Sequence, residues 1–160
     1  MKICVIGMGY VGISNAILLA QKHHVICIDI DAKKLNLIQN KISPIKDSLV
    51  SSYLKKKKLN IEVSNVIDSR LSSCKFIIIS TPTNFDASKK SFDISSINKI
   101  IEKVDKLKIK ASIVIKSTIP IGYVSKLNNK YKNLNIYFSP EFLREGHSLH
   151  DNLYPSRIII

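Results

Sequence analysis

The amino-acid sequence predicts an α/β fold in which a doubly wound parallel sheet carries helices on both faces. Continuous apolar runs, typical of strands buried on both faces, alternate with segments whose apolar residues recur at helical spacing. A glycine-rich turn joins the first apolar run directly to the first helical segment. Hydroxyl-rich polar segments follow later runs, where the ligand crevice of such a sheet lies. Right-handed crossovers then give the doubly wound arrangement.

The expected elements begin with a buried strand at residues 2–6, which ends at the first glycine of the turn. A helix is expected at 10–21, and a second buried strand at 25–30. The helix expected at 95–107 places four apolar side chains on one face. The other expected elements are helices at 32–39 and 47–57, strands at 61–63, 76–80, 111–116 and 136–138, a helical turn at 65–71 and a polar loop at 86–91.

Residues 155–160 form an apolar ending that is expected to begin a further strand. Because domains rarely end inside a core strand, we expect the chain to be truncated there. The alternative is that the last three isoleucines close the edge of the sheet.

The composition is that of one ordinary globular domain. The chain has 160 residues, and 45% of them are hydrophobic, which is enough for a core. The formal net charge is +13, but the excess is spread as lysine and only three arginines are present, so we expect no nucleic-acid partner. Glycines interrupt the first apolar stretch, and no apolar run is long enough to cross a bilayer. We therefore expect neither a signal peptide nor a membrane partner.

The cysteines and histidines predict neither a disulfide nor a metal site. Cys4, Cys27 and Cys74 form no CxxC pair, and their odd number gives no disulfide framework. Cys4 and Cys27 lie in apolar runs and are expected to be buried, which fits a reduced, cytoplasmic setting. His147 and His150 are three residues apart, but the sequence offers no evident third ligand.

The glycine-rich turn has the spacing G-x-G-x-x-G that holds a dinucleotide in the Rossmann type of sheet. It follows a strand, opens a helix and precedes a strand that ends in an acid, at Gly7-Met8-Gly9-Tyr10-Val11-Gly12. Gly7 makes the tight turn, Gly9 lets the backbone approach a pyrophosphate, and Gly12 lets the helix pack closely on the strand. The helix N-terminus supplies N–H groups and a favourable dipole for the phosphates. The alternative is a purely structural glycine turn.

Asp29 ends the second strand, at the offset expected for the carboxylate that accepts the ribose hydroxyls of the cofactor. A negative charge there repels a 2′-phosphate, which favours NAD over NADP. Asp31 is the second candidate, but it lies where a helix cap is expected. Lys33 and Lys34 weigh against the NAD preference, since a nearby cation can tolerate a phosphate.

Polar segments follow the later strands at the edge where the cofactor is expected. Ordinary turns and helix caps would explain any one of them, but several in succession favour a ligand crevice. The segments are residues 80–84, 116–122, 139–146 and 151–157.

From residue 1 to residue 160 the sequence resembles the UDP-glucose/GDP-mannose dehydrogenase family. The most specific pieces are the glycine turn with Tyr10-Val11, Thr81-Pro82-Thr83, Lys116-Ser117-Thr118 and the stretch 141–146. Residues 41–45 and 153–157 are similar to those of the bacterial UDP-glucose enzymes.

The glycine motif and the resemblance together imply a set of site residues. The cofactor-binding residues are Gly7, Gly9, Tyr10, Val11, Gly12, Asp29, Lys34, Thr83, Thr118 and Glu145. Those that line the sugar-nucleotide site are Glu141, Phe142, Leu143, Arg144 and Glu145. The catalytic residues, which position water and handle protons, are Thr118, Glu141 and Glu145.

The resemblance also implies an activity. The family oxidises C6 of the sugar twice, from UDP-glucose to UDP-glucuronate, through a thiohemiacetal and a thioester on a cysteine, and reduces two NAD. In the family, the catalytic cysteine, lysine and aspartate lie beyond the position of Ile160, with the helix that pairs two subunits into a homodimer and the UDP-sugar domain. We therefore expect these 160 residues to be an NAD-binding domain without activity of their own.

Other functions remain open at this point. The chain can be a standalone NAD-binding regulatory module, or belong to a family member that acts on GDP-mannose or UDP-N-acetylmannosamine. A 6-phosphogluconate or 3-hydroxyacyl type of dehydrogenase is a further alternative, but it leaves residues 142–146 unexplained.

Overall fold

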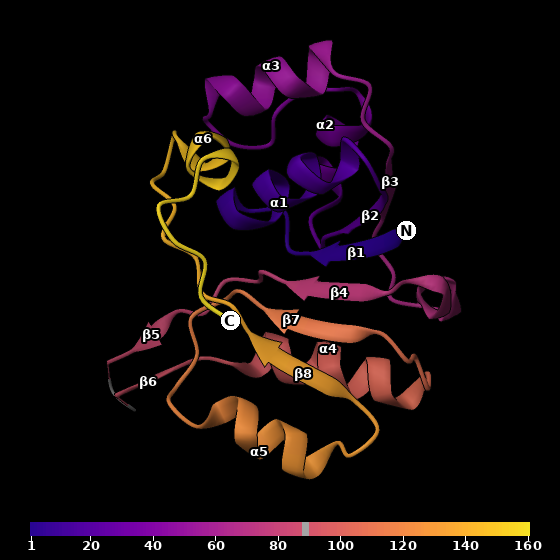
Figure 1. Cartoon of the computed structure of the whole chain (residues 1–160), viewed down its shortest axis with the longest axis vertical. Coiled ribbons are helices and arrows are strands. Elements are labelled where there is room, and N and C mark those ends of the chain that lie inside the picture. Colours follow the sequence, from indigo (N-terminus) through magenta and orange to yellow (C-terminus); the bar gives the residue numbers. More distant parts are fainter. Residues whose placement is uncertain (88–89) are drawn as a thin grey trace.

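The computed structural model describes residues 1–87 and 90–160. Within them, six strands form one parallel sheet in the order β3-β2-β1-β4-β7-β8 (Figure 1). This confirms the predicted doubly wound parallel sheet. The strands are β1 (Lys2–Ile6), β2 (His24–Ile28), β3 (Ile61–Ser64), β4 (Phe76–Ile79), β7 (Ser112–Ile115) and β8 (Asn135–Phe138).

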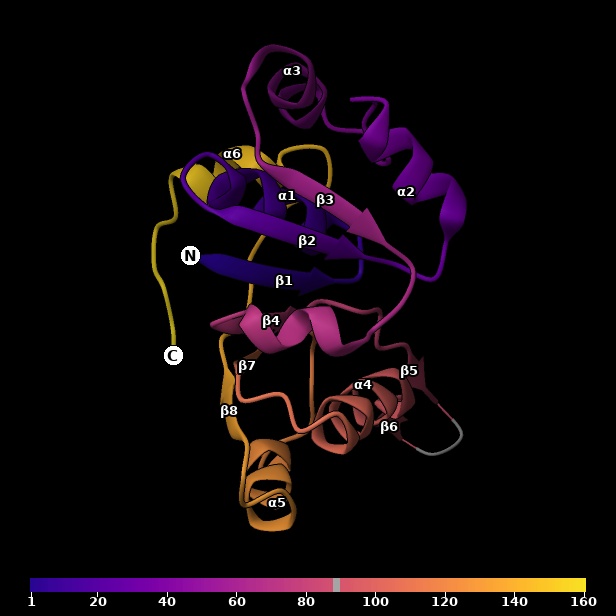
Figure 2. The same cartoon turned by 90° about the vertical axis from the view of Figure 1, so that its right-hand side faces the viewer.

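Helices cover both faces of the sheet, as expected (Figures 1 and 2). One face packs against α1 (Tyr10–Ala20), α2 (Ala32–Gln39), α3 (Ser48–Lys56) and α6 (Ser148–Leu153). The other packs against α4 (Ser95–Lys106), α5 (Tyr123–Lys130) and the 3₁₀ helix η1 (Ser69–Ser73). No helix in the described part of the chain is long and apolar enough to pass through a bilayer.

Burial on both faces explains why the central strands β1, β2 and β4 are almost continuously apolar. In β1, Cys4 and Ile6 belong to the core shared with α4 and α5, whereas Ile3 and Val5 belong to the core shared with α1. Each of these four residues is at most 4% exposed. A strand with two buried faces has no place for alternating polar residues.

The chain reverses its winding between β1 and β4, which are neighbours in the sheet. The helix that follows β1 packs on one face, and the helix that follows β4 packs on the other. The carboxyl ends of these two strands therefore mark the topological switch point, beside which ligands bind in open α/β sheets.

Several elements differ from the sequence prediction. The helical turn expected at 65–71 is η1, which begins later, and α5 and α6 were not predicted. Part of the expected polar loop at 86–91 is a hairpin of β5 (Phe85–Asp86) and β6 (Ser91–Phe92), and residues 88–89 lie outside the described residues. The strand expected at 155–160 is wrong: residues 157–160 have no regular structure, and their apolar side chains are exposed.

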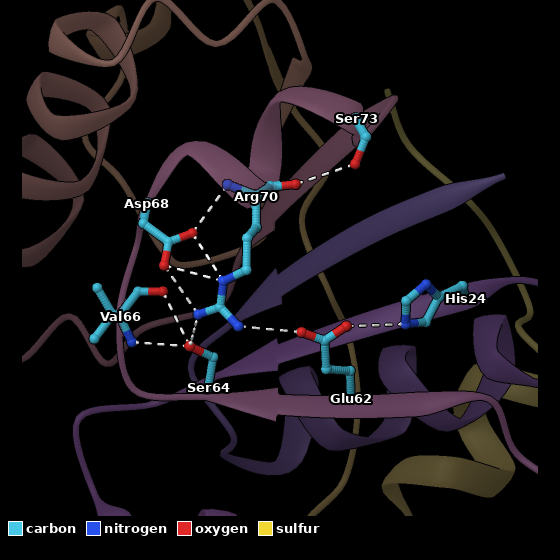
Figure 3. Close-up of polar contacts among 7 residues, drawn as sticks. All are labelled: His24, Glu62, Ser64, Val66, Asp68, Arg70 and Ser73. Atoms are coloured by element: carbon cyan, nitrogen blue, oxygen red, sulfur yellow. Dashed lines mark hydrogen bonds and ion pairs between the residues drawn. The ribbon is translucent and has the colours of Figure 1, made fainter.

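A polar network fastens η1 to β3, the edge strand of the sheet (Figure 3). The guanidinium of Arg70 binds Glu62 at 3.3 Å, Ser64 at 2.8 Å and Asp68 at 2.9 Å. Glu62 also lies 3.2 Å from His24 Nε2. The hydrogen bonds from Arg70 lower the pKa of Asp68. Exposed ion pairs stabilise little, so this network orients η1 more than it stabilises the fold.

Candidate functional site

Two of the three motif glycines are required by packing within the protein. Gly7 has a φ of +95°, and its N–H donates to the carbonyl of Ile28 at 2.8 Å. A Cβ at Gly7 would lie 2.7 Å from the carbonyl oxygen of Ser80, and one at Gly12 would lie 1.7 Å from the carbonyl oxygen of Gly7. These glycines therefore allow β1, β4 and α1 to meet at the turn.

Gly9 has no such reason to be glycine. Its φ of −84° suits any residue, and a Cβ built there has no atom of the described residues within 4 Å. It is the N-cap of α1, and among the described side chains none caps this helix. An uncapped helix N-terminus behind a bare backbone fits a phosphate group, so the approach of a pyrophosphate stays the prediction for Gly9.

The two acidic candidates after β2 have separate roles. Asp29 is 8% exposed, and its carboxylate accepts from the N–H of Met8 at 2.6 Å and from the N–H of Asp31 at 2.9 Å. A carboxylate has about four lone-pair positions, so Asp29 keeps acceptor capacity for ribose hydroxyls. Asp31 caps α2 by accepting from Lys33 N–H at 2.9 Å. Lys34 Nζ lies 4.0 Å from Asp29 Oδ2.

The first hydroxyl groups after β4 and β7 hold the loops together. Ser80 Oγ donates to the carbonyl oxygens of Ile6 and Gly7, each at 3.0 Å, and Ser117 Oγ donates to that of Thr81 at 2.6 Å. Ser80 and Ser117 thus have a structural role in these turns, which is the alternative to a role in ligand binding.

Four further predicted residues lie at the cofactor edge of the sheet. Thr83 follows β4 and is half-buried, whereas Thr118 follows β7 and is exposed. Tyr10 and Val11 form the first turn of α1 and are half-buried. All four follow carboxyl ends of β1, β4 or β7, so the fold brings them to the same edge of the sheet.

A cleft of about 540 Å³ lies beside this edge, between α1, the loop after β8 and α6. At its base, Lys116 Nζ forms an ion pair with Glu141 Oε1, and the two side chains are 14% and 12% exposed. Asn15 Nδ2 donates to the same Glu141 oxygen at 3.5 Å, and Lys116 Nζ donates to the carbonyl of Ser139 at 3.4 Å. A carboxylate is thereby fixed next to a cation in a sheltered cleft.

Arg144 is held on the rim of the cleft by Asp151, which lies on α6. Its Nε and Nη2 donate to the two carboxylate oxygens at 3.0 and 2.7 Å. These hydrogen bonds keep the pKa of Asp151 well below its usual value. The guanidinium of Arg157 lies 4.3 Å from the ring centre of Phe142, which is 53% exposed.

The structure thus gathers most of the predicted substrate residues, with one exception. Glu141, Phe142, Leu143 and Arg144 line the cleft, whereas Glu145 is exposed and absent from the described lining. The roles of all these residues remain predictions.

Sequence reasoning missed three residues that shape the cleft. Lys116 lies in one of the pieces that resemble the family, but no role was predicted for it. Asp151 was named only as part of the polar segment 151–157. Asn15 faces the cleft from within α1, and its position one helical turn after Val11 was the available signal.

Burial disfavours ionisation of the three thiols. Burial raises the pKa of Cys27 to about 12, and burial also raises the pKa values of Cys4 and Cys74. A thiolate is the reactive form of cysteine. In the described part of the chain, no group of three His, Cys, Asp or Glu residues is placed to hold a metal ion.

Comparisons with known proteins agree with this geometry. The model of the UDP-glucose/GDP-mannose dehydrogenase family, NAD binding domain, matches residues 1–160. The chain is 46% identical, over its whole length, to a UDP-glucose 6-dehydrogenase of Streptococcus pneumoniae, of which it covers 41%. It is 41% identical over 162 residues to the UDP-glucose 6-dehydrogenase of Campylobacter jejuni subsp. jejuni, again covering the whole chain and 41% of the relative.

A solved structure shows the same fold. A GDP-mannose dehydrogenase from Pseudomonas aeruginosa, in a ternary complex, superposes with a TM-score of 0.86 at 21% identity. The match covers 99% of this chain and 40% of that one. The chain therefore spans about two fifths of the length of the proteins it matches.

Proposed function

Because the chain belongs to the UDP-glucose/GDP-mannose dehydrogenase family as its NAD-binding domain, we propose that it serves the NAD-dependent oxidation of UDP-glucose to UDP-glucuronate. The observation that carries the proposal is the cleft built on Glu141 and Lys116. In the sheet, β4 lies between β7, which Lys116 follows, and β1, which leads into the glycine turn. The relatives that match over the whole chain at 46% and 41% identity are UDP-glucose 6-dehydrogenases.

The described residues suit the two parts of this task. The glycine turn and the N-terminus of α1 bind the pyrophosphate of NAD, and Asp29 accepts hydrogen bonds from the ribose hydroxyls. NAD, when bound, accepts a hydride from the sugar carbon. Thr83, Thr118 and Glu145 complete the cofactor contacts in this proposal.

The substrate part of the proposal rests on the cleft. Glu141 and Thr118 handle a proton and orient water beside the sugar, while Phe142, Leu143 and Arg144 line the sugar-nucleotide site. The buried thiols of this chain supply no nucleophile, so we assign these 160 residues no complete reaction of their own.

A chimeric enzyme tests the proposal. The chain replaces the matching 41% of the Streptococcus pneumoniae enzyme, to which it is 46% identical. We expect the purified chimera to form NADH with UDP-glucose, followed by absorbance at 340 nm. Its kcat/KM is expected to lie within about 100-fold of the parent, which allows about 2.7 kcal/mol for repacking the new interface.

Two controls test the assigned substrate separately from correct folding of the chimera. The 160-residue chain alone is assayed beside the chimera and is expected to form no NADH. A chimera that is folded and binds NAD, yet oxidises GDP-mannose in preference to UDP-glucose, would contradict the assigned substrate.

Replacing Asp29 with asparagine is expected to shift the cofactor preference from NAD towards NADP by about tenfold or more. The substitution removes the charge that repels a 2′-phosphate and weakens hydrogen bonds that are worth about 1.5–3 kcal/mol with a charged acceptor. Lys34, 4.0 Å away, then faces the phosphate without a competing carboxylate. Calorimetry with both cofactors measures the ratio of the two dissociation constants, which does not depend on the folded fraction.

Asp31→Asn is the matched control, because asparagine caps helices as well as aspartate does. It is expected to leave the ratio of NAD to NADP affinity unchanged. If the two substitutions shifted the ratio equally, Asp29 would not be the residue that selects the cofactor.

A further inference from the structure

Asp47 is a buried carboxylate that accepts hydrogen bonds at the start of two helices. Its Oδ1 accepts from the N–H groups of Leu49 at 3.0 Å and Val50 at 3.1 Å, in the first turn of α3. Its Oδ2 accepts from Ser148 Oγ at 2.9 Å and from the N–H of Leu149 at 3.3 Å, in the first turn of α6. Asp47 is only 5% exposed. Two helix N-termini thus share one negative charge, which both helix dipoles favour.

The helix α6 depends on this distant cap because its own N-cap residue supplies none. His147 has a φ of −127° and a ψ of 14°, and in the described structure its side chain makes no capping hydrogen bond. The helix has six residues, and helices this short are marginal without outside support. Asp47 provides that support from 101 residues earlier in the sequence.

The same helix fixes the loop that lines the cleft. Gly146 turns the chain into α6 with a φ of +80°. The carboxylate of Asp151, on α6, then accepts from the guanidinium of Arg144 and, at 3.1 Å, from the backbone N–H of Arg144. The position of Arg144 is therefore set by the position of α6.

A third helix joins the same buried point. Ser14 Oγ, on α1, donates to Ser148 Oγ at 2.8 Å, and neither residue is exposed to solvent. Helix α1 begins at the glycine turn that binds the cofactor. The helix of the cofactor site and the helix of the cleft loop therefore meet at Ser148, which donates to the carboxylate of Asp47.

We propose that Asp47 is a positioning residue, which places the loop 139–147 and Arg144 relative to the cofactor turn by capping α6 from a distance. It acts through α6, since the described lining of the cleft does not include it. The inference rests on the proposed function in one respect, namely that this loop receives the sugar nucleotide.

Asp47→Asn tests the proposal selectively in the 160-residue chain. The asparagine oxygen still accepts from Leu49 and Val50, but its NH₂ group faces two donors at Ser148 and Leu149. We expect amide hydrogen exchange in α6 to become about tenfold to hundredfold faster, because a buried donor at the start of this helix loses its acceptor. The first turn of α3 is expected to keep its protection.

The Nε–H resonance of Arg144 provides a second readout at a residue that Asp47 does not touch. It is expected to lose its hydrogen-bonded shift in Asp47→Asn, because Asp151 moves with α6. The matched control is Asp31→Asn. Asp31 caps α2 with one oxygen only, which asparagine retains, so α6 and the Arg144 resonance are expected to be unchanged.

A double substitution distinguishes the specific contact between Asp47 and Ser148 from a general contribution of Asp47 to stability. Ser148→Ala removes one of the donors that the asparagine NH₂ would face, so Asp47→Asn with Ser148→Ala is expected to speed exchange in α6 by less than the product of the two single effects. Multiplicative effects, or equal loss of protection in α3 and α6, would overturn the proposal. The exchange measurements need neither NAD nor a sugar nucleotide. An inactive chimera would therefore count against the proposed function alone.

Discussion

Replacing Gly12 with alanine is expected to destabilise the folded chain by about 3 kcal/mol, at the upper end of the cost of overpacking. The new Cβ would lie 1.7 Å from the carbonyl oxygen of Gly7. Because that neighbour is backbone at the end of β1, no side-chain rotation relieves the clash, and α1 must move away from the sheet. For a chain of this size we expect Tm to fall by roughly 6–12 °C in a thermal melt followed by circular dichroism.

Gly146→Ala is the control that separates a clash from backbone strain. Gly146 has a φ of +80°, but a Cβ there meets its nearest atom, the carbonyl oxygen of Lys46, at an ordinary 3.7 Å. Only the left-handed conformation is then penalised, at about 1 kcal/mol. If Gly12→Ala cost no more than Gly146→Ala, close packing of α1 on the turn would not be the reason for Gly12.

The sheet and the cofactor turn could be predicted because their causes are local. A strand buried on both faces must be apolar, and β1, β2, β4 and β7 are apolar after their first residues. The spacing of Gly7, Gly9 and Gly12 follows from the geometry of one strand, one turn and one helix. The position of Asp29 follows from the length of α1 and β2, which the sequence also shows.

The cleft could be predicted only in part, because its contacts join distant segments. The ion pair of Lys116 with Glu141 requires the parallel register of β7 and β8, which no local pattern reveals. The hydrogen bond between Asp47 and Ser148 spans 101 residues. The helix α6 was missed because its cap comes from Asp47, far away in the sequence, whereas its own N-cap residue, His147, is not a residue type that favours a helix start.

The apolar ending shows the opposite error. Three consecutive isoleucines favour a strand, yet Ile158, Ile159 and Ile160 are 74%, 44% and 90% exposed. A strand needs a neighbour to receive its hydrogen bonds, and among the described strands none pairs with this segment. The high β-propensity of isoleucine predicted a strand, but a strand forms only where it pairs with a neighbour, and the sequence did not show that this segment has none.

Replacing Gly9 with serine is expected to have opposite effects on folding and on binding. Serine is a good N-cap, so the free energy of unfolding should stay level or rise by a few tenths of a kcal/mol. The added Cβ meets no atom of the described chain within 4 Å, so the fold accommodates it without a clash. A urea titration is expected to confirm that the free energy of unfolding does not fall.

The same substitution is expected to weaken NAD binding by about 100-fold, which corresponds to about 2.7 kcal/mol. The serine side chain occupies the space through which the pyrophosphate approaches the backbone. Its Oγ also accepts from N–H groups at the start of α1 that would otherwise bind phosphate. Calorimetry with NAD measures the loss. Undiminished NAD affinity in a variant with unchanged stability would show that the pyrophosphate does not approach Gly9, because the structure offers no packing reason for a glycine at that position.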